Sequence, residues 1–193
     1  IGGWKYLVQR AILARVASAD TPPVAVWCDE AQTAVTSFDA HFLAQCRSHH
    51  GCMVMLSQSL PGYYAALGGQ NGKQYVDALQ ASLTTKVFHA LGDLETANWA
   101  SGLVGRSLTT FTGGSSSPSD GAYQTLLGGS QFSSNFSEAY ENTLQTNDFM
   151  HGLRTGGPRN GFVCDCFVIR SGQPFASGNN WLATSFSQKR GAS

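Results

Sequence analysis

Hydrophobic positions follow two different periods along the first hundred residues, and the two alternate. Short continuous apolar runs, typical of strands buried in a parallel sheet, occupy residues 24–28 and 52–56, and residues 84–89 predict a third strand. Between these runs, apolar side chains recur every three or four positions, which predicts helices over residues 4–16, 37–49, 61–67, 75–82 and 93–103. This alternation predicts an α/β fold, with parallel strands joined by helical crossovers.

Local signals support these helices. Ser37 and Asp93 are suited to cap the helices that follow them, and Pro61 suits a first helical turn. The first helix is amphipathic, with one apolar stripe made by Trp4, Leu7, Val8, Ala11 and Ile12. The helix after Ser37 is expected to turn inward Phe38, Phe42, Leu43 and Cys46.

The pattern changes near Ser107, and the chain is expected to divide into segments 1–106, 107–137 and 138–193. The middle segment is rich in Gly, Ser and Thr and has no sustained apolar period, which predicts a flexible loop or insertion. The third is expected to be an irregular C-terminal extension with little regular structure. Its predicted elements are a weak helix over 135–144, a short helix over 149–153, a strand over 162–169 and a hairpin return after 175.

Composition narrows the class of protein. The 193 residues suit one ordinary domain, and 12 Lys and Arg balance 12 Asp and Glu. A domain that grips nucleic acid by itself usually carries a basic excess, which is absent here. Charged residues make up 12%, about half the usual share, as expected if more protein covers part of the surface. No apolar run suffices to span a bilayer, and five cysteines without framework spacing favour a reducing compartment.

The most informative residues are Asp29 and Glu30, which follow the strand over 24–28. Ligands of open α/β sheets bind at the carboxyl ends of strands. There, Asp29 can hold Mg²⁺, mostly through water, and Glu30 can orient and deprotonate a water that attacks a γ-phosphate. This is the Walker B arrangement of P-loop ATPases. The alternative is a pair of solvated acids after a strand.

Two further residues suit the same chemistry. Gln58 follows the next strand and can hydrogen-bond a γ-phosphate or the attacking water, or it can simply complete a turn. Arg47 ends the intervening helix, where it can serve as an arginine finger toward a neighbouring subunit's nucleotide. Its alternative is a cation favoured by the helix dipole.

Taken together, these residues resemble one family over about residues 4–106. The quoted segments are Asp29-Glu30-Ala31-Gln32, Phe38-Asp39, Arg47-Ser48, Leu56-Ser57-Gln58-Ser59-Leu60, Leu83-Thr84-Thr85-Lys86-Val87-Phe88 and Asp93-Leu94-Glu95-Thr96-Ala97. They are similar to the C-terminal part of TraG/TraD-like coupling proteins of conjugation and type IV secretion, which belong to the FtsK/HerA group of P-loop ATPases. The fold implied is a RecA-like parallel sheet flanked by helices, of which this chain holds the Walker B half.

The resemblance also implies roles and partners. Asp29 would be the magnesium-linked acid, Glu30 the catalytic base, Gln58 the sensor and Arg47 the trans finger, with ATP and Mg²⁺ as cofactors. The parent would be a homo-oligomer, a hexameric ring that drives DNA and its relaxase toward secretion-channel proteins. It would work at the cytoplasmic face of the inner membrane, anchored by helices outside this chain.

The chain departs from the family in having no Walker A loop. Residues 68–74 imitate the motif poorly, because Leu67 stands where the first glycine belongs and Gln74 replaces the Ser or Thr. We therefore expect the phosphate loop upstream of Ile1 in a longer parent.

The sequence supports a zinc site or a base-stacking surface less strongly than an ATP site. Zinc could use Cys46, His49, His50 and Cys52, or Cys164 and Cys166, but buried cysteines more often act as small hydrophobes. His41, His89 and His151 are isolated. Base stacking by aromatic residues is an alternative to helix packing for Tyr63, Tyr64, Trp99 and Trp181.

Two other functions stay open beside the ATPase. The chain can be a non-catalytic module that docks relaxosome or secretion partners, in which case the full-length parent would not bind nucleotide. It can also belong to a related motor that packages phage or chromosomal DNA, which the sequence upstream of Ile1 would reveal.

Because the phosphate loop is missing from the sequence, we expect no ATP turnover by these 193 residues alone. Phosphate release should stay at the level of a no-protein blank, and steady release above it would contradict this expectation.

Overall fold

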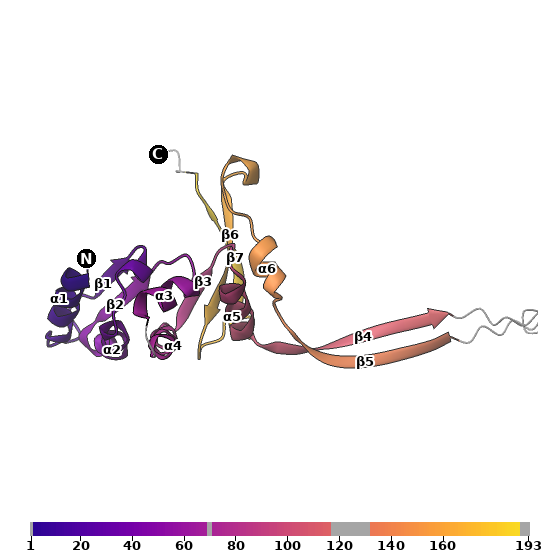
Figure 1. Ribbon diagram of the computed structural model, residues 1–193, viewed down its shortest axis with the longest axis horizontal. Coiled ribbons are helices and arrows are strands. Elements are labelled where there is room, and N and C mark those ends of the chain that lie inside the picture. Colours follow the sequence, from indigo (N-terminus) through magenta and orange to yellow (C-terminus); the bar gives the residue numbers. More distant parts are fainter. Residues whose placement is uncertain (1, 69–70, 117–131, 190–193) are drawn as a thin grey trace, which may run out of the picture.

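The computed structural model describes residues 2–68, 71–116 and 132–189 (Figure 1). The helices are α1 (Gly2–Leu13), α2 (Phe38–Gln45), α3 (Leu60–Leu67), α4 (Gly72–Ser82), α5 (Leu94–Val104) and α6 (Thr146–His151), with 3-10 turns η1 (Ala31–Thr33), η2 (Cys46–His49) and η4 (Pro158–Asn160). The strands are β1 (Val24–Cys28), β2 (Gly51–Met55), β3 (Thr85–Phe88), β4 (Arg106–Ser116), β5 (Phe132–Asn142), β6 (Val163–Arg170) and β7 (Trp181–Ser187). Among these residues, no helix combines the length and the hydropathy that a bilayer crossing requires.

The sheet that carries the predicted site is formed by β1 and β2. They pair in parallel, with a register from Val24–Gly51 to Cys28–Met55. One face is covered by α1 and α2 through a core cluster of Ile12, Phe42, Cys46 and Met53. The opposite face carries Trp27, which is 70% exposed. Since parallel sheets are normally covered on both faces, this face lacks its usual cover among the described residues.

The third predicted strand forms but has a different partner. β3 pairs antiparallel with β6, and β6 pairs antiparallel with β7. Phe88 on β3 packs edge-on against Phe149 of α6, which in turn packs against Phe167 of β6, so β3 is drawn into a separate core with α5 and α6. The expectation of an α/β fold is met, but its single parallel sheet is reduced to two strands.

The middle segment differs most from the prediction. Residues 106–116 and 132–142 are strands β4 and β5 of one long antiparallel hairpin, not a loop and not a helix over 135–144. The remaining predicted loop residues, 117–131, lie outside the described residues. Thr and Tyr side chains favour the extended backbone. No strand period was recognised because Ser, Thr and Gly outnumber the apolar residues over 106–116.

The C-terminal residues agree better with the expectations. α6 begins with a capping box, in which Gln145 and Asp148 exchange side-chain and backbone hydrogen bonds. The predicted hairpin is β6 and β7. This extension is therefore more regular than the irregular one expected from its composition.

Helix α1 packs with its polar side inward. Lys5 and Gln9 are buried, whereas Trp4 is 78% exposed and Leu7 is 58% exposed. An apolar stripe normally faces the core. Here α1 is rotated so that most of this stripe lies outside and only Ile12 joins the core.

The reason for this rotation is the fully buried Asp39 of α2. Its carboxylate accepts hydrogen bonds from Lys5 Nζ at 2.5 Å, from Gln9 Nε2 at 2.7 Å and from the Thr36 backbone N–H at 2.7 Å. The predicted cap, Ser37, makes no side-chain hydrogen bond at the start of α2. Asp39 therefore both organises the start of α2 and fixes α1 upon it.

We predict that Asp39→Ala lowers the free energy of unfolding by about 3–5 kcal/mol, because it leaves Lys5 buried without its counter-charge. Urea denaturation measures this change. The matched control is Asp77→Ala, which breaks an exposed pair with Lys73 and should change stability by less than about 0.5 kcal/mol. Equal stability of the two variants would contradict the role given to Asp39.

Candidate functional site

The carboxyl ends of β1 and β2 are held together beyond the strands themselves. The Leu56 N–H donates to the Cys28 carbonyl at 2.8 Å, and the Ala31 N–H donates to the Leu56 carbonyl at 2.8 Å. Ala31 and Leu60 are then buried in one cluster with Tyr63, Val76 and Leu79. This cluster fixes the spacing of the two strand-end loops that carry Glu30 and Gln58.

Glu30 lies where these two loops meet. Its backbone is left-handed, with φ 48° and ψ 45°, which is uncommon for a residue with a side chain. Its Oε1 accepts a hydrogen bond from Gln58 Nε2 at 2.9 Å, and its Oε2 accepts one from Gln32 Nε2 at 2.5 Å. The structure therefore brings Glu30 and Gln58 together across two neighbouring strands.

Asp29 has a different environment. Its Oδ1 accepts the Glu30 backbone N–H at 3.0 Å, and its side chain is exposed and has no ion pair within the described residues. It lines a recess of about 270 Å³ together with Trp4, Lys5, Val8, Val26, Trp27, Cys28 and Ala34. Burial raises the pKa of the neighbouring Cys28 thiol, a shift that Lys5 opposes, so this thiol is uncharged at neutral pH.

The donor set at this edge suits Mg²⁺ better than a transition metal. Within the described residues, no three His, Cys, Asp or Glu side chains gather closely enough to enclose a metal ion. Magnesium does not need such a cage, because it keeps several waters and binds through one or two carboxylates plus substrate phosphates. Asp29, with an accessible carboxylate, fits that mode.

Arg47 lies away from these residues within its own chain. It is exposed in η2, directly before β2, and so at the amino end of the strand, whereas Gln58 follows the carboxyl end. Its side chain makes no hydrogen bond or ion pair within the described part of the chain. A role in trans would use a second copy, so the position of Arg47 here does not test that prediction.

Two site residues had no role assigned from the sequence. Gln32 holds the second oxygen of Glu30, and its own Oε1 is buried without a partner. Thr96 Oγ1 of α5 accepts the Leu60 N–H at 2.9 Å, while its backbone N–H bonds the Asp93 cap at 2.8 Å. Both residues lie in the segments that resemble the family, so the resemblance could have marked them as residues of the site.

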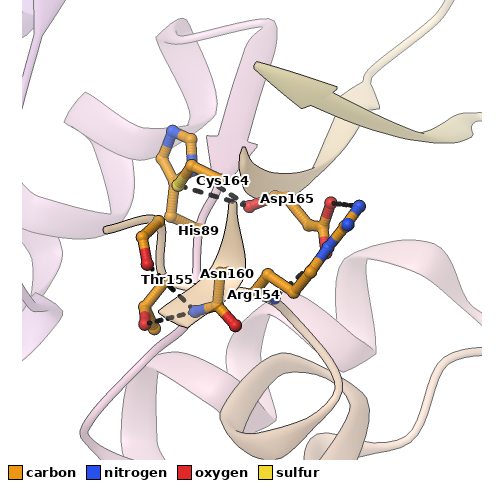
Figure 2. Close-up of polar contacts among 7 residues, drawn as sticks. His89, Arg154, Thr155, Asn160, Cys164 and Asp165 are labelled. Atoms are coloured by element: carbon orange, nitrogen blue, oxygen red, sulfur yellow. Dashed lines mark hydrogen bonds and ion pairs between the residues drawn. The ribbon is translucent and has the colours of Figure 1, made fainter. Parts of the chain in front are cut away.

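The zinc alternatives receive no geometric support. Cys46 is buried and its thiol faces the Leu43 carbonyl, while His49 and His50 each place Nδ1 against a backbone carbonyl, at 2.8 Å and 2.9 Å. Cys164 Sγ lies 3.3 Å from His89 Nδ1 and 3.9 Å from the Asp165 carbonyl oxygen (Figure 2). Cys166 is buried in the core.

An ion pair stabilises the chain beside that Cys164–His89 contact. Arg154 donates from Nε and Nη2 to the two oxygens of Asp165, at 2.7 Å and 2.8 Å, and its backbone N–H adds a third bond at 3.0 Å (Figure 2). These hydrogen bonds lower the pKa of Asp165 below its ordinary value of 3.8. The pair fastens the segment after α6 to β6.

Comparison with known proteins identifies relatives. The family model described as the TraM recognition site of TraD and TraG matches residues 23–151, more than half of the chain. A solved structure, the bacterial conjugative coupling protein TrwBdeltaN70 in an unbound monoclinic form, is similar with a TM-score of 0.58 and 13% identity. The match covers 97% of this chain and 36% of that one, so the chain spans about a third of the coupling protein's length. No curated protein matches.

The Arg154–Asp165 pair predicts a pH dependence. The charged Asp165 contributes stability that is present above the ordinary carboxyl pKa of 3.8 and is lost as pH falls through the lower folded value. We therefore expect Asp165→Asn to lower the melting temperature at pH 7, and this difference from the unmodified chain to shrink as the pH is lowered below 3.8. Thermal melts at a series of pH values test it.

The control for that series is Glu95→Gln, which removes an exposed carboxylate with no ion pair among the described residues. Its effect should be small at every pH. A deficit for Asp165→Asn that persists unchanged at low pH would assign the contribution to packing rather than to charge.

Proposed function

This chain belongs to the TraG/TraD family of conjugative coupling proteins, and we propose that it supplies the water-activating half of an ATP site in a longer coupling protein. The match to the TraG/TraD model favours conjugation over the phage or chromosome packaging motors considered as an alternative. The activity belongs to the whole protein, of which a similar structure is nearly three times as long.

One observation carries the proposal, namely the Glu30–Gln58 hydrogen bond across two parallel strand ends. A general base must lie within reach of the proton that it removes and must be held in one orientation. Gln58 and Gln32 each occupy one lone pair of the Glu30 carboxylate, and each oxygen keeps a second lone pair. Glu30 can therefore accept a water proton without losing its support.

The neighbouring residues complete the proposed mechanism. Asp29 holds Mg²⁺, mostly through water, beside the phosphates, and the ion supplies charge neutralisation there when it is bound. Gln58 orients Glu30 and hydrogen-bonds the γ-phosphate side of the site. Arg47, which is exposed in the turn before β2, reaches the site of an adjacent copy in a ring.

A phosphate-binding loop from another region of the same protein completes this site. The uncovered sheet face around Trp27 and the exposed stripe of α1 favour such an addition, because both are apolar surfaces that water-exposed domains rarely leave free. The substrate moved by the assembled motor is DNA with its relaxase, and other regions of the protein attach it to the inner membrane.

A second function is favoured by the description of the matched family. The family model is described as the TraM recognition site of TraD and TraG, and it matches residues 23–151 of this chain. We propose that this chain also docks a relaxosome protein. If docking were its sole function, the full-length protein would not bind nucleotide.

We predict that Glu30→Gln in the full-length protein retains ATP binding but lowers turnover by about 10²–10⁴-fold, because the base is removed while its shape is kept. Phosphate release measures turnover, and fluorescence titration with an ATP analogue measures binding. Glu95→Gln is the matched control and should keep both. Full turnover by Glu30→Gln would remove Glu30 from its role, and absence of nucleotide binding by the unmodified protein would favour the docking function alone.

A further inference from the structure

The hairpin of β4 and β5, here called the arm, projects away from the helical body of the molecule (Figure 1). A two-stranded ribbon by itself is marginally stable in water. At its base, Leu108 is 51% exposed and Tyr140, its cross-strand neighbour, is 70% exposed. Glu138 and Glu141 are exposed as well. Side chains on both faces of β5 are therefore exposed near the base of the arm. The arm needs a partner outside its own chain.

The charge of the arm restricts the chemistry of that partner. Residues 106–142 contain one basic residue, Arg106 at the start of β4, and three acidic residues, Asp120, Glu138 and Glu141, so the segment carries a net negative charge. Basic side chains supply most of the affinity for a phosphate backbone, so a nucleic acid is a poor partner for this acidic segment. A basic protein surface suits it instead.

The same chain carries such a surface beyond α6. Residues 152–189 hold four basic residues and only one acidic residue, Asp165, which is already paired with Arg154. Arg159 and Lys189 are exposed and have no ion pair within the described residues. These two cations are free to meet carboxylates from another molecule.

Both cations lie near the C-terminal end of β7, whose outer edge is unprotected. Lys189 is two residues beyond the strand, and Gly157, directly before the turn of Arg159, donates its N–H to Gln188 Oε1 at 2.9 Å. β7 pairs with β6 on one side and with no other strand of the described residues. Its residues, Trp181–Ser187, include no charged residue and no proline, which natural edge strands commonly use to prevent pairing. Leu182 and Phe186 are exposed on it. An edge of this kind accepts an added strand.

We propose that the arm of one copy lies along the β7 edge of a second copy, with Glu138 and Glu141 facing Arg159 and Lys189. Figure 1 shows the arm leading away from β6 and β7 of its own chain, so the contact joins two molecules. Because two different surfaces meet, the contact is head-to-tail and can propagate into a ring or a filament. This contact between the arm and the β7 edge gives the proposed ring of copies a defined interface. Its formation does not depend on ATP hydrolysis.

Sedimentation velocity of the 193-residue chain over a range of concentrations tests the proposal. The unmodified chain should associate as concentration rises. The arm variant Glu138→Lys/Glu141→Lys and the edge variant Arg159→Glu/Lys189→Glu should each associate about tenfold more weakly, because like charges then face each other. Asp20→Lys/Glu95→Lys makes the same charge change away from both surfaces and should associate normally.

Mixing the two variants gives the decisive result. The lysines of the first variant's arm then face the glutamates of the second variant's edge, and the glutamates of the second variant's arm face the unchanged cations of the first. Association should therefore return, with the two variants alternating. Circular dichroism should show the same folded content in all variants. A monomeric unmodified chain at every concentration, association that neither variant weakens, or a mixture that stays monomeric would each overturn the proposal.

A second readout maps the contact. A carbodiimide that joins carboxylates to amines should link Glu138 or Glu141 to Lys189, the only lysine in residues 152–189. In a mixture of nitrogen-14 and nitrogen-15 chains, the linked peptides should carry both isotopes. Single-isotope links alone, or arm-dependent binding of single-stranded DNA in place of self-association, would also overturn the inference.

Discussion

The buried carboxylate of Asp39 is the interaction on which the N-terminal α/β part of the structure depends. Three donors converge on it, from two turns of α1 and from the backbone before α2. A charge without solvent is stable only when it is paired and hydrogen-bonded, so this carboxylate selects the face of α1 that turns inward. The exposed apolar stripe of α1 follows from that choice, and Trp4, Lys5 and Val8 of the same helix line the recess beside Asp29.

The strand-end residues show a similar hierarchy. Backbone hydrogen bonds beyond β1 and β2 hold the two loops together, and a buried cluster sets their spacing. Within this frame, Gln32 and Gln58 hydrogen-bond the carboxylate of Glu30. The left-handed backbone of Glu30 is maintained by these surroundings, because an isolated residue with a side chain disfavours that conformation. The site is thus organised before any ligand is bound, which suits a base that must act in one orientation.

Sequence periodicity predicted β1, β2 and most helices well, because continuous apolar runs and helical spacing are local properties. The meeting of Glu30 with Gln58 also followed, since carboxyl ends of neighbouring parallel strands share one edge. The inward side of α1 did not, because the deciding partner, Asp39, lies 34 residues from Lys5 in the chain. The partner of β3 depended on distant Phe167, and Ser, Thr and Gly dominate residues 106–116, so no strand period was recognised there.

Helix α5 connects two parts of the molecule that otherwise lie apart. Near its first turn, Thr96 holds the Leu60 N–H, two residues beyond Gln58. At its last residue the chain passes through Gly105, whose positive φ of 96° suits glycine, directly into the arm. The loop of Gln58 and the arm are therefore joined through one threonine hydroxyl, one helix of 11 residues and one glycine.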